Sequence, residues 1–143
     1  MQQTSKRIVV VDQSRTIQVL LRTYFGNAGH QVLTCSTPGE ALRTLSSLRE
    51  APTMIFLAID HAKEAYKVIT YVKEHRAYSQ TSIVVMVLAE ERASIQTSIL
   101  RTLSAISYLV KPFHIQDALK LVSPSVPGNA SLDEHAIARE GNT

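Results

Sequence analysis

Six residues at or just after the ends of apolar runs are the candidates for chemistry in this chain. They are Asp12, Gln13, Ala58, Asp60, Leu88 and Lys111. If the runs are parallel strands, these residues lie at the edge of the sheet where open α/β domains hold their ligands. A lysine in such a crevice is costly unless an opposite charge is close, so we favour a buried Asp12–Lys111 pair over a pair without consequence. We expect the two charged groups to lie within about 4 Å of each other.

Five runs that are wholly or mostly apolar alternate with segments that have helical periodicity, and together these elements would position the six residues. The runs are residues 8–11, 32–35, 54–59, 83–89 and 106–110. Strands that are apolar at every position are typical of a parallel sheet covered by helices on both faces. We therefore expect an α/β domain with a doubly wound, five-stranded parallel sheet in the flavodoxin-like order 2-1-3-4-5.

Several helix boundaries can be predicted from capping residues. Ser14 is the expected N-cap of the first helix, which glycines 26 and 29 should end. Thr37 and Glu40 have the spacing of a capping box, and Pro38 would occupy the first helical position. The predicted apolar stripe of the first helix is Ile17, Leu20, Leu21, Tyr24 and Ala28.

Length and composition indicate one self-sufficient domain in residues 1–123, followed by a flexible tail or linker in residues 124–143. The chain has 143 residues, of which 45% are hydrophobic and 19% charged. Cys35 is the single cysteine, so no internal disulfide can form, and its expected role is that of a small buried side chain. The formal charge of +3 is spread along the chain, which gives nucleic-acid binding little support. We expect a cytoplasmic protein that has neither a signal peptide nor a membrane span.

Three segments resemble one known family. Residues 10–12 read Val-Val-Asp, residues 86–90 read Met-Val-Leu-Ala-Glu, and residues 108–113 read Tyr-Leu-Val-Lys-Pro-Phe. With Ser14 after the first segment, they resemble the receiver domains of bacterial two-component systems, especially the single-domain regulators of chemotaxis and twitching motility. The resemblance covers about residues 6–122.

The resemblance implies a phosphorylation site that this chain does not retain. A working receiver needs two adjacent acids that hold magnesium, an acceptor aspartate, a hydroxyl and a lysine. Asp12 and Lys111 match two of these positions, whereas Gln13, Ala58 and Leu88 replace the second acid, the acceptor and the hydroxyl. We therefore expect a pseudo-receiver that is not an enzyme, uses no metal or cofactor, and binds a partner protein as a monomer or weak dimer.

The expected partner surface consists of the fourth helix, the fifth strand and the fifth helix. Receivers commonly signal through this face, and the predicted fourth helix, residues 92–103, is poor in charge between residues 93 and 100. Charge depletion beside an aromatic residue is typical of an interface centre. The candidate contacts are Ile95, Ile99, Tyr108 and His114. Tyr108 matches a family position whose side-chain rotamer reports activation. It also fits an ordinary aromatic residue that buries its ring and exposes its hydroxyl to solvent.

Two other functions stay open. Asp60 lies two residues after Ala58, so it could act as a displaced phosphoacceptor, although a loop aspartate that caps the following helix is the more ordinary interpretation. A flavodoxin-like domain could also bind a small ligand in the crevice, although the sequence lacks a glycine-rich phosphate loop. The basic side of the third helix (Lys63, Lys67, Lys73 and Arg76) and all five histidines are expected to be solvated.

Overall fold

The computed structural model describes residues 5–59, 62–90 and 106–123. Its strands are β1 (Arg7–Val11), β2 (Gln31–Cys35), β3 (Met54–Ala58), β4 (Ser82–Leu88) and β5 (Ile106–Lys111). Its helices are α1 (Arg15–Asn27), α2 (Pro38–Ser47), α3 (Ala62–Glu74), the 3-10 helix η1 (Arg76–Tyr78) and α5 (Ile115–Val122). The candidate residues Asp60, Ile95 and Ile99, and the expected tail, lie outside the described residues.

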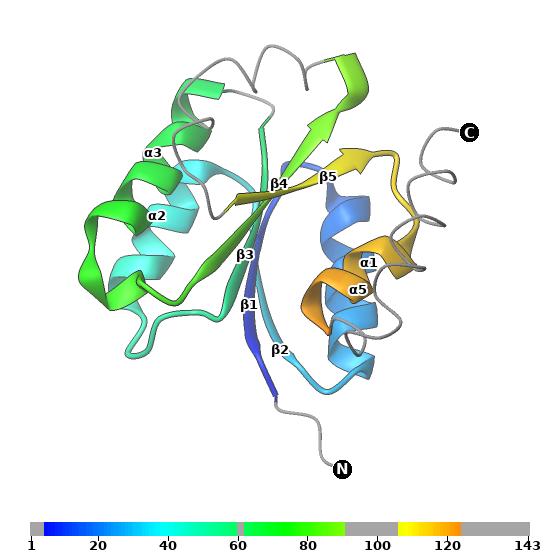
Figure 1. Ribbon diagram of the computed structural model, residues 1–143, viewed down its shortest axis with the longest axis horizontal. Coiled ribbons are helices and arrows are strands. Elements are labelled where there is room, and N and C mark those ends of the chain that lie inside the picture. Colours follow the sequence, from blue (N-terminus) through cyan, green and yellow to red (C-terminus); the bar gives the residue numbers. More distant parts are fainter. Residues whose placement is uncertain (1–4, 60–61, 91–105, 124–143) are drawn as a thin grey trace.

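The five strands form one parallel sheet in the order β2-β1-β3-β4-β5, which confirms the expected fold class. Helices cover both faces: α2 and α3 pack on one side, and α1 and α5 pack on the other (Figure 1). Because all strands run in the same direction, their carboxyl ends meet at one edge of the sheet. This edge holds the candidate site.

Each face of the sheet has its own hydrophobic core, because side chains alternate between the faces along a strand. Val9, Ile55 and Val85 pack with α2 and α3, whereas Val10, Phe56 and Met86 pack with α1 and α5. Even-numbered residues of β1, β3 and β4 thus face α1 and α5. In β5 the parity is reversed, since Leu109 belongs to the α1/α5 side and Tyr108 packs against the α2/α3 side.

The capping predictions are confirmed. The Ser14 side chain accepts a hydrogen bond from the Ile17 amide at 3.3 Å, and the Thr37 side chain accepts one from the Glu40 amide at 3.1 Å. Pro38 is the first residue of α2. The Glu40 carboxylate accepts from the amide of Ser36, one residue before the cap, at 2.7 Å. Gly29 has a φ of +96°, a conformation that L side chains rarely adopt, so it can turn the chain from α1 into β2.

The predicted apolar stripe of α1 was wrong at one position. Tyr24 is 42% exposed, while its neighbour Phe25 is fully buried against Phe56, with ring centroids 5.1 Å apart. Gln18 is buried as well, because its amide has hydrogen-bond partners. Gly26 lies inside α1 and does not end it, so the chain turns at Gly29 instead.

Two further expectations need correction. His30 is buried, contrary to the expectation that every histidine is solvated, and its Nδ1 accepts a hydrogen bond from the Lys6 amide at 3.1 Å. Arg76 belongs to η1 and not to the basic side of α3, because that helix ends at Glu74. Strand boundaries differ from the predicted ones by a single residue at several ends, where β4 begins at Ser82 and β5 extends to Lys111. None of the helices in the described residues is long and apolar enough to cross a membrane.

Candidate functional site

The carboxyl ends of β1, β3, β4 and β5 bring the candidate residues to one side of the sheet. Ala58 pairs with Met86 across β3 and β4, and Leu88 pairs with Lys111 across β4 and β5. Asp12 follows Val11, the last residue of β1, which is in register with Leu57. By strand parity, Asp12, Ala58, Leu88 and Lys111 all belong to the face covered by α1 and α5.

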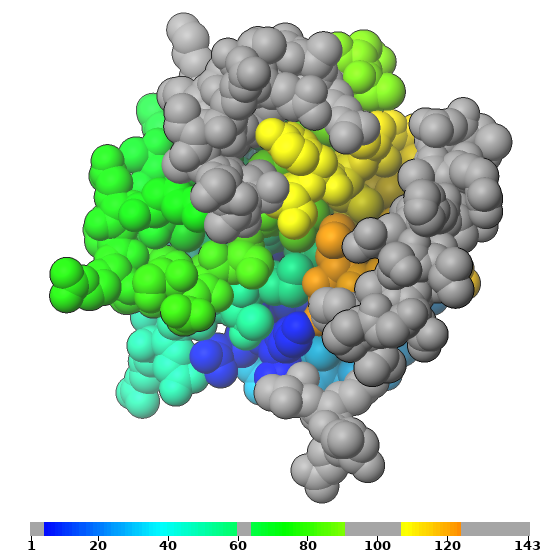
Figure 2. Space-filling model, viewed as in Figure 1, coloured from blue at the N-terminus to red at the C-terminus, as the bar shows by residue number. Residues whose placement is uncertain are grey.

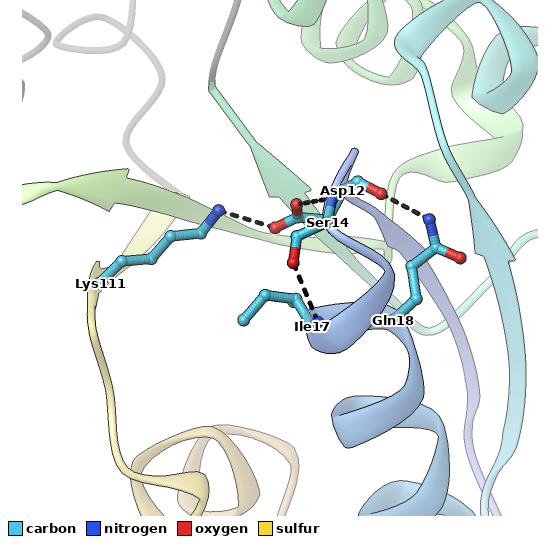
Figure 3. Close-up of polar contacts among 5 residues, drawn as sticks. All are labelled: Asp12, Ser14, Ile17, Gln18 and Lys111. Carbon is cyan, nitrogen blue, oxygen red and sulfur yellow. Dashed lines mark hydrogen bonds and ion pairs between the residues drawn. The ribbon is translucent and has the colours of Figure 1, made fainter.

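Asp12 and Lys111 form an ion pair at the centre of this edge. The Lys111 Nζ lies 2.8 Å from the Asp12 Oδ2, which confirms the predicted contact (Figure 3). Only 1% of the Asp12 side chain and 15% of the Lys111 side chain are exposed. The pair joins residues 99 positions apart in the sequence and links the carboxyl end of β1 to that of β5. Two opposite charges at this distance in a largely dry environment stabilise each other strongly.

The second oxygen of the Asp12 carboxylate is also occupied. Its Oδ1 accepts a hydrogen bond from the Ser14 amide at 2.7 Å, within the turn that starts α1 (Figure 3). Asp12 therefore uses one oxygen to hold this turn and the other to hold Lys111. In this arrangement each oxygen of the carboxylate already has a donor.

Gln18 is a residue of the site that the sequence did not predict. Its Nε2 donates to the backbone carbonyl of Asp12 at 2.7 Å and to the Ser36 hydroxyl at 3.2 Å. The side chain thus ties the end of β1 to the loop between β2 and α2. A polar residue at a position flanked by the apolar residues Ile17, Leu20 and Leu21 was the available signal, since a buried amide must find partners.

A pocket of about 120 Å³ opens beside the ion pair. Its walls come from the ends of β1 and β3 and from the loop that leads into α2, namely Val11, Asp12, Gln13, Ser36, Thr37, Pro38 and Ala58. Gln13 is exposed, whereas Ala58, which also lines the pocket, is buried. The acceptor position of the family resemblance therefore contributes only a methyl group to this pocket.

The side chains of the site do not provide the ligands that a divalent cation such as magnesium requires. Mg²⁺ prefers oxygen ligands in octahedral geometry, including one or more carboxylates. Asp12 is the one carboxylate among the lining residues, and both of its oxygens have other partners. Across the described parts of the chain, no group of three or more histidine, cysteine, aspartate or glutamate side chains could hold a metal ion.

The remaining candidates lie around the pocket or away from it. Leu88 is exposed at the end of β4, next to Lys111 in register. Tyr108 is partly buried and packs against the α2/α3 core. His114 is exposed at the N-cap of α5, and its side chain makes no capping hydrogen bond. Neither Tyr108 nor His114 is among the residues that line the pocket.

Comparisons with known proteins agree with this architecture. No protein-family model matches the chain. Protein PilG of Pseudomonas aeruginosa is 23% identical over 128 residues, which cover 89% of this chain and 92% of PilG. The structure of the chemotaxis response regulator CheY4 of Vibrio cholerae has 21% sequence identity and a TM-score of 0.69, over 83% of this chain and 97% of CheY4. A response regulator from Thermotoga maritima is 21% identical with a TM-score of 0.67, over 83% of this chain and 95% of that protein.

These similarities cover most of this chain and nearly all of each related protein, at low sequence identity. The strand order of the sheet agrees with them. The chain therefore has the fold of response-regulator receiver domains.

Proposed function

We propose that this chain is a pseudo-receiver, a signalling module that binds a partner protein without being phosphorylated. The observation that carries the proposal is Ala58 in the lining of the pocket, at the position where the family resemblance expects the phosphoacceptor aspartate. An alanine side chain has no nucleophilic atom, so a covalent aspartyl phosphate cannot form there.

The state of Lys111 supports the same proposal. In a phosphorylated receiver, as the resemblance implies, this lysine would contact the phosphoryl group. Here its ammonium lies 2.8 Å from Asp12, so its charge is already balanced within the protein. A site with no unbalanced charge gives a phosphate little differential affinity for one conformation, and without such a difference a ligand cannot shift a population.

Phosphorylation can be tested directly with the full chain. It would be incubated with acetyl phosphate or phosphoramidate and Mg²⁺, and its intact mass would then be measured. We expect no added phosphoryl group on the parent chain. The matched variant carries Ala58→Asp and Gln13→Asp, which restore two of the missing carboxylates, and we expect it to gain one phosphoryl group.

Asp60 provides the outcome that would contradict the proposal. If the parent chain gained one phosphoryl group and the variant Asp60→Ala lost it, Asp60 would be a displaced acceptor and the module would switch. The experiment thus distinguishes the pseudo-receiver from the phosphotransfer alternative by a mass difference.

We assign the partner surface to β5 and α5, together with the fourth helix that the sequence predicts in residues 92–103, outside the described residues. Tyr108 of β5 is half-buried and His114 at the start of α5 is exposed, so both can contact another protein. Figure 2 shows side chains of β5 (yellow) and α5 (orange) at the molecular surface. Ile95 and Ile99, which lie outside the described residues, are assigned to this surface from the sequence and the family resemblance. Tyrosine is one of the residue types that most often dominate the binding energy of an interface.

The partner surface can be tested by comparing a variant of this surface with a control variant on another face of the domain. Partners captured from the protein's own cell extract would be identified by mass spectrometry, purified, and titrated against the parent chain. The variant Tyr108→Ala, Ile95→Lys should weaken binding at least about tenfold, which corresponds to about 1.4 kcal/mol. Val19→Lys introduces a lysine at an exposed apolar position of α1 and should leave the affinity unchanged. Equal affinity of all three folded proteins would eliminate this surface.

A further inference from the structure

The outer edge of β2 has an unusual composition for an exposed strand. β2 lies at one end of the sheet (Figure 1), and its five residues, Gln31–Cys35, include no charged side chain and no proline. Natural edge strands usually carry such residues, because they discourage pairing with another chain. Leu33, in the middle of β2, is 47% exposed, more than the other exposed large apolar side chains in the described residues.

The register of β2 with β1 shows which backbone groups point outward. The Gln31 amide donates to the Lys6 carbonyl, and the Asp12 amide donates to the Cys35 carbonyl. In a parallel pair, alternate residues of a strand direct their N–H and C=O groups to the same neighbour. Residues 31, 33 and 35 therefore face β1, whereas Val32 and Thr34 direct their backbone donors and acceptors away from the sheet.

We propose that the β2 edge is an interface between two copies of this chain. The copies pair β2 with β2 in the antiparallel direction, around a two-fold axis that passes beside Leu33. Val32 of each copy then lies opposite Thr34 of the other, and the outward backbone groups of these residues form hydrogen bonds in two pairs. Leu33 lies opposite its own counterpart at the closely spaced position that has no ladder hydrogen bond, where cross-strand side chains are nearest.

A two-fold interface requires a surface that complements itself. The β2 edge meets this requirement, so a second copy is the occupant that it fits best. In the paired strands Gln31 faces Cys35, Val32 faces Thr34 and Leu33 faces Leu33, so no like charges meet. A charged partner strand would find no opposite charge in β2. Leu33 also has the same parity as Val9 and Cys35, on the α2/α3 face of the sheet, and its exposure shows that neither helix covers it. The leucine of a second copy can therefore contact it.

The expected association is weak. Five residues from each copy bury much less than the roughly 800 Å² per partner of a standard interface. Sedimentation velocity of the full chain, measured from roughly 10 µM to 1 mM, covers the range in which such weak interfaces form. We expect the weight-average sedimentation coefficient to rise with concentration from the monomer value towards the dimer value.

Two lysine substitutions distinguish the β2 edge from other surfaces. Leu33→Lys places like charges opposite each other and should keep the chain monomeric at every concentration. Val19→Lys replaces a residue of similar exposure, 42%, on α1 and should dimerise like the parent chain. A parent chain that stays monomeric at about 1 mM, or two variants with the same behaviour, would overturn the proposal.

A third variant tests the backbone pairing itself, and it is informative even if Leu33→Lys does not fold. Thr34→Pro removes an outward N–H and leaves the β1 ladder intact, since proline is tolerated where an edge-strand amide faces solvent. It should stay folded and monomeric. In the parent chain, the amides of Val32 and Thr34 should exchange with deuterium about two- to fivefold more slowly at about 1 mM than at about 10 µM, because pairing protects them in the dimer. Unchanged exchange of both amides in a concentrated dimer would assign the interface to another surface.

Discussion

Asp12 organises the site at the level of single residues. One carboxylate oxygen accepts the Ser14 amide that begins α1, and the other contacts the Lys111 ammonium at the end of β5. Its backbone carbonyl accepts the Gln18 amide, which also reaches Ser36. A residue with only 1% of its side chain exposed thus connects four segments of the chain. Its effect on stability should exceed that of a surface ion pair, which contributes about 0–1 kcal/mol.

The stability of the Asp12–Lys111 pair can be measured with single and double variants. Asp12→Ala should lower the free energy of unfolding by about 3 kcal/mol, because the lysine loses its partner and the Ser14 amide loses its acceptor. Asp12→Asn keeps an oxygen for Ser14, so it should cost less. The double variant Asp12→Asn, Lys111→Met should cost less than the sum of its two single variants, since neither charge is left alone. Urea midpoints provide the measurement, and a midpoint unchanged in Asp12→Ala would contradict the structural role.

His30 should make the stability of the domain depend on pH. Burial, and next the charge of Lys6, lower the pKa of His30 below its ordinary value of 6.5. Its Nδ1 accepts a hydrogen bond from the Lys6 amide, so a proton on this nitrogen would face the amide N–H and break the bond. The unfolded chain therefore binds the proton more readily than the folded chain does. The His30 contribution to stability is fully present above the ordinary pKa and is lost as the pH falls through 6.5 towards the lower folded value.

Urea unfolding between about pH 5 and pH 7.5 measures this contribution, because the slope of stability against pH reports the difference in bound protons. The parent chain should lose stability on acidification, and His30→Phe should show a smaller loss. His75→Gln is the comparison variant, because it removes a histidine that is exposed at the surface. Equal slopes in the parent chain and His30→Phe would assign the pH dependence to other groups.

The sequence predicted the charged part of the site better than its uncharged part. The Asp12–Lys111 contact follows from strand ends that meet and from the cost of an unbalanced buried charge. Gln18 was missed because its burial depends on a partner far away in the sequence, Ser36. The burial of His30, at the opposite edge of the sheet, was missed for the same reason, since its partner Lys6 is also distant in the sequence. The boundaries of the pocket likewise depend on how the loop before α2 lies against β1 and β3.

At the level of elements, apolar runs and capping residues determined most of the secondary structure. The five strands lie within one residue of their predicted bounds, and Ser14 and Thr37 cap their helices. The orientation of α1 was less predictable, because Tyr24 and Phe25 are adjacent and both are aromatic. Packing against Phe56 selected Phe25 for the core, which leaves the tyrosine with its polar hydroxyl at the surface.

The connection after α3 also stabilises the end of α2. The Tyr78 hydroxyl of η1 donates to the Leu45 carbonyl near the end of α2 at 3.0 Å. Burial, together with a hydrogen bond and a charge interaction with Tyr71, raises the pKa of Tyr78 to about 12. The phenol therefore keeps its proton, and this hydrogen bond, throughout the neutral range.

Tyr78→Phe should lower the free energy of unfolding by about 1 kcal/mol, the usual contribution of one hydrogen bond. The loss should stay small because the Leu45 carbonyl keeps a second donor, the Leu48 amide at 3.3 Å, and the ring keeps its place in the core. Tyr78→Ala should cost about 3 kcal/mol or more, since it also leaves a cavity. Denaturant midpoints give both values, and a phenylalanine variant as unstable as the alanine variant would contradict this division between hydrogen bond and packing.

At the level of the whole molecule, the strand order 2-1-3-4-5 was predictable because alternating strands and helices allow few topologies. The sheet brings together Asp12 and Lys111, which are far apart in the sequence. It also separates the α1/α5 core from the α2/α3 core. The identity of the partner could not be predicted, since many functions share one fold and are determined by surface residues.

The extent of the domain leads to the last prediction. All buried residues of the two cores lie between Ile8 and Val122 in the described part of the chain, and α5 ends there with Ser123 as its C-cap. Residues 124–143 begin with a proline- and glycine-containing segment that is typical of a linker. Deletion of these residues should therefore shift the melting temperature by no more than about 2 °C, as expected when a segment outside the core is removed. Calorimetry of the truncated and full chains at equal concentration measures the shift, and a drop of roughly 5 °C or more would mean that residues 124–143 pack against the domain.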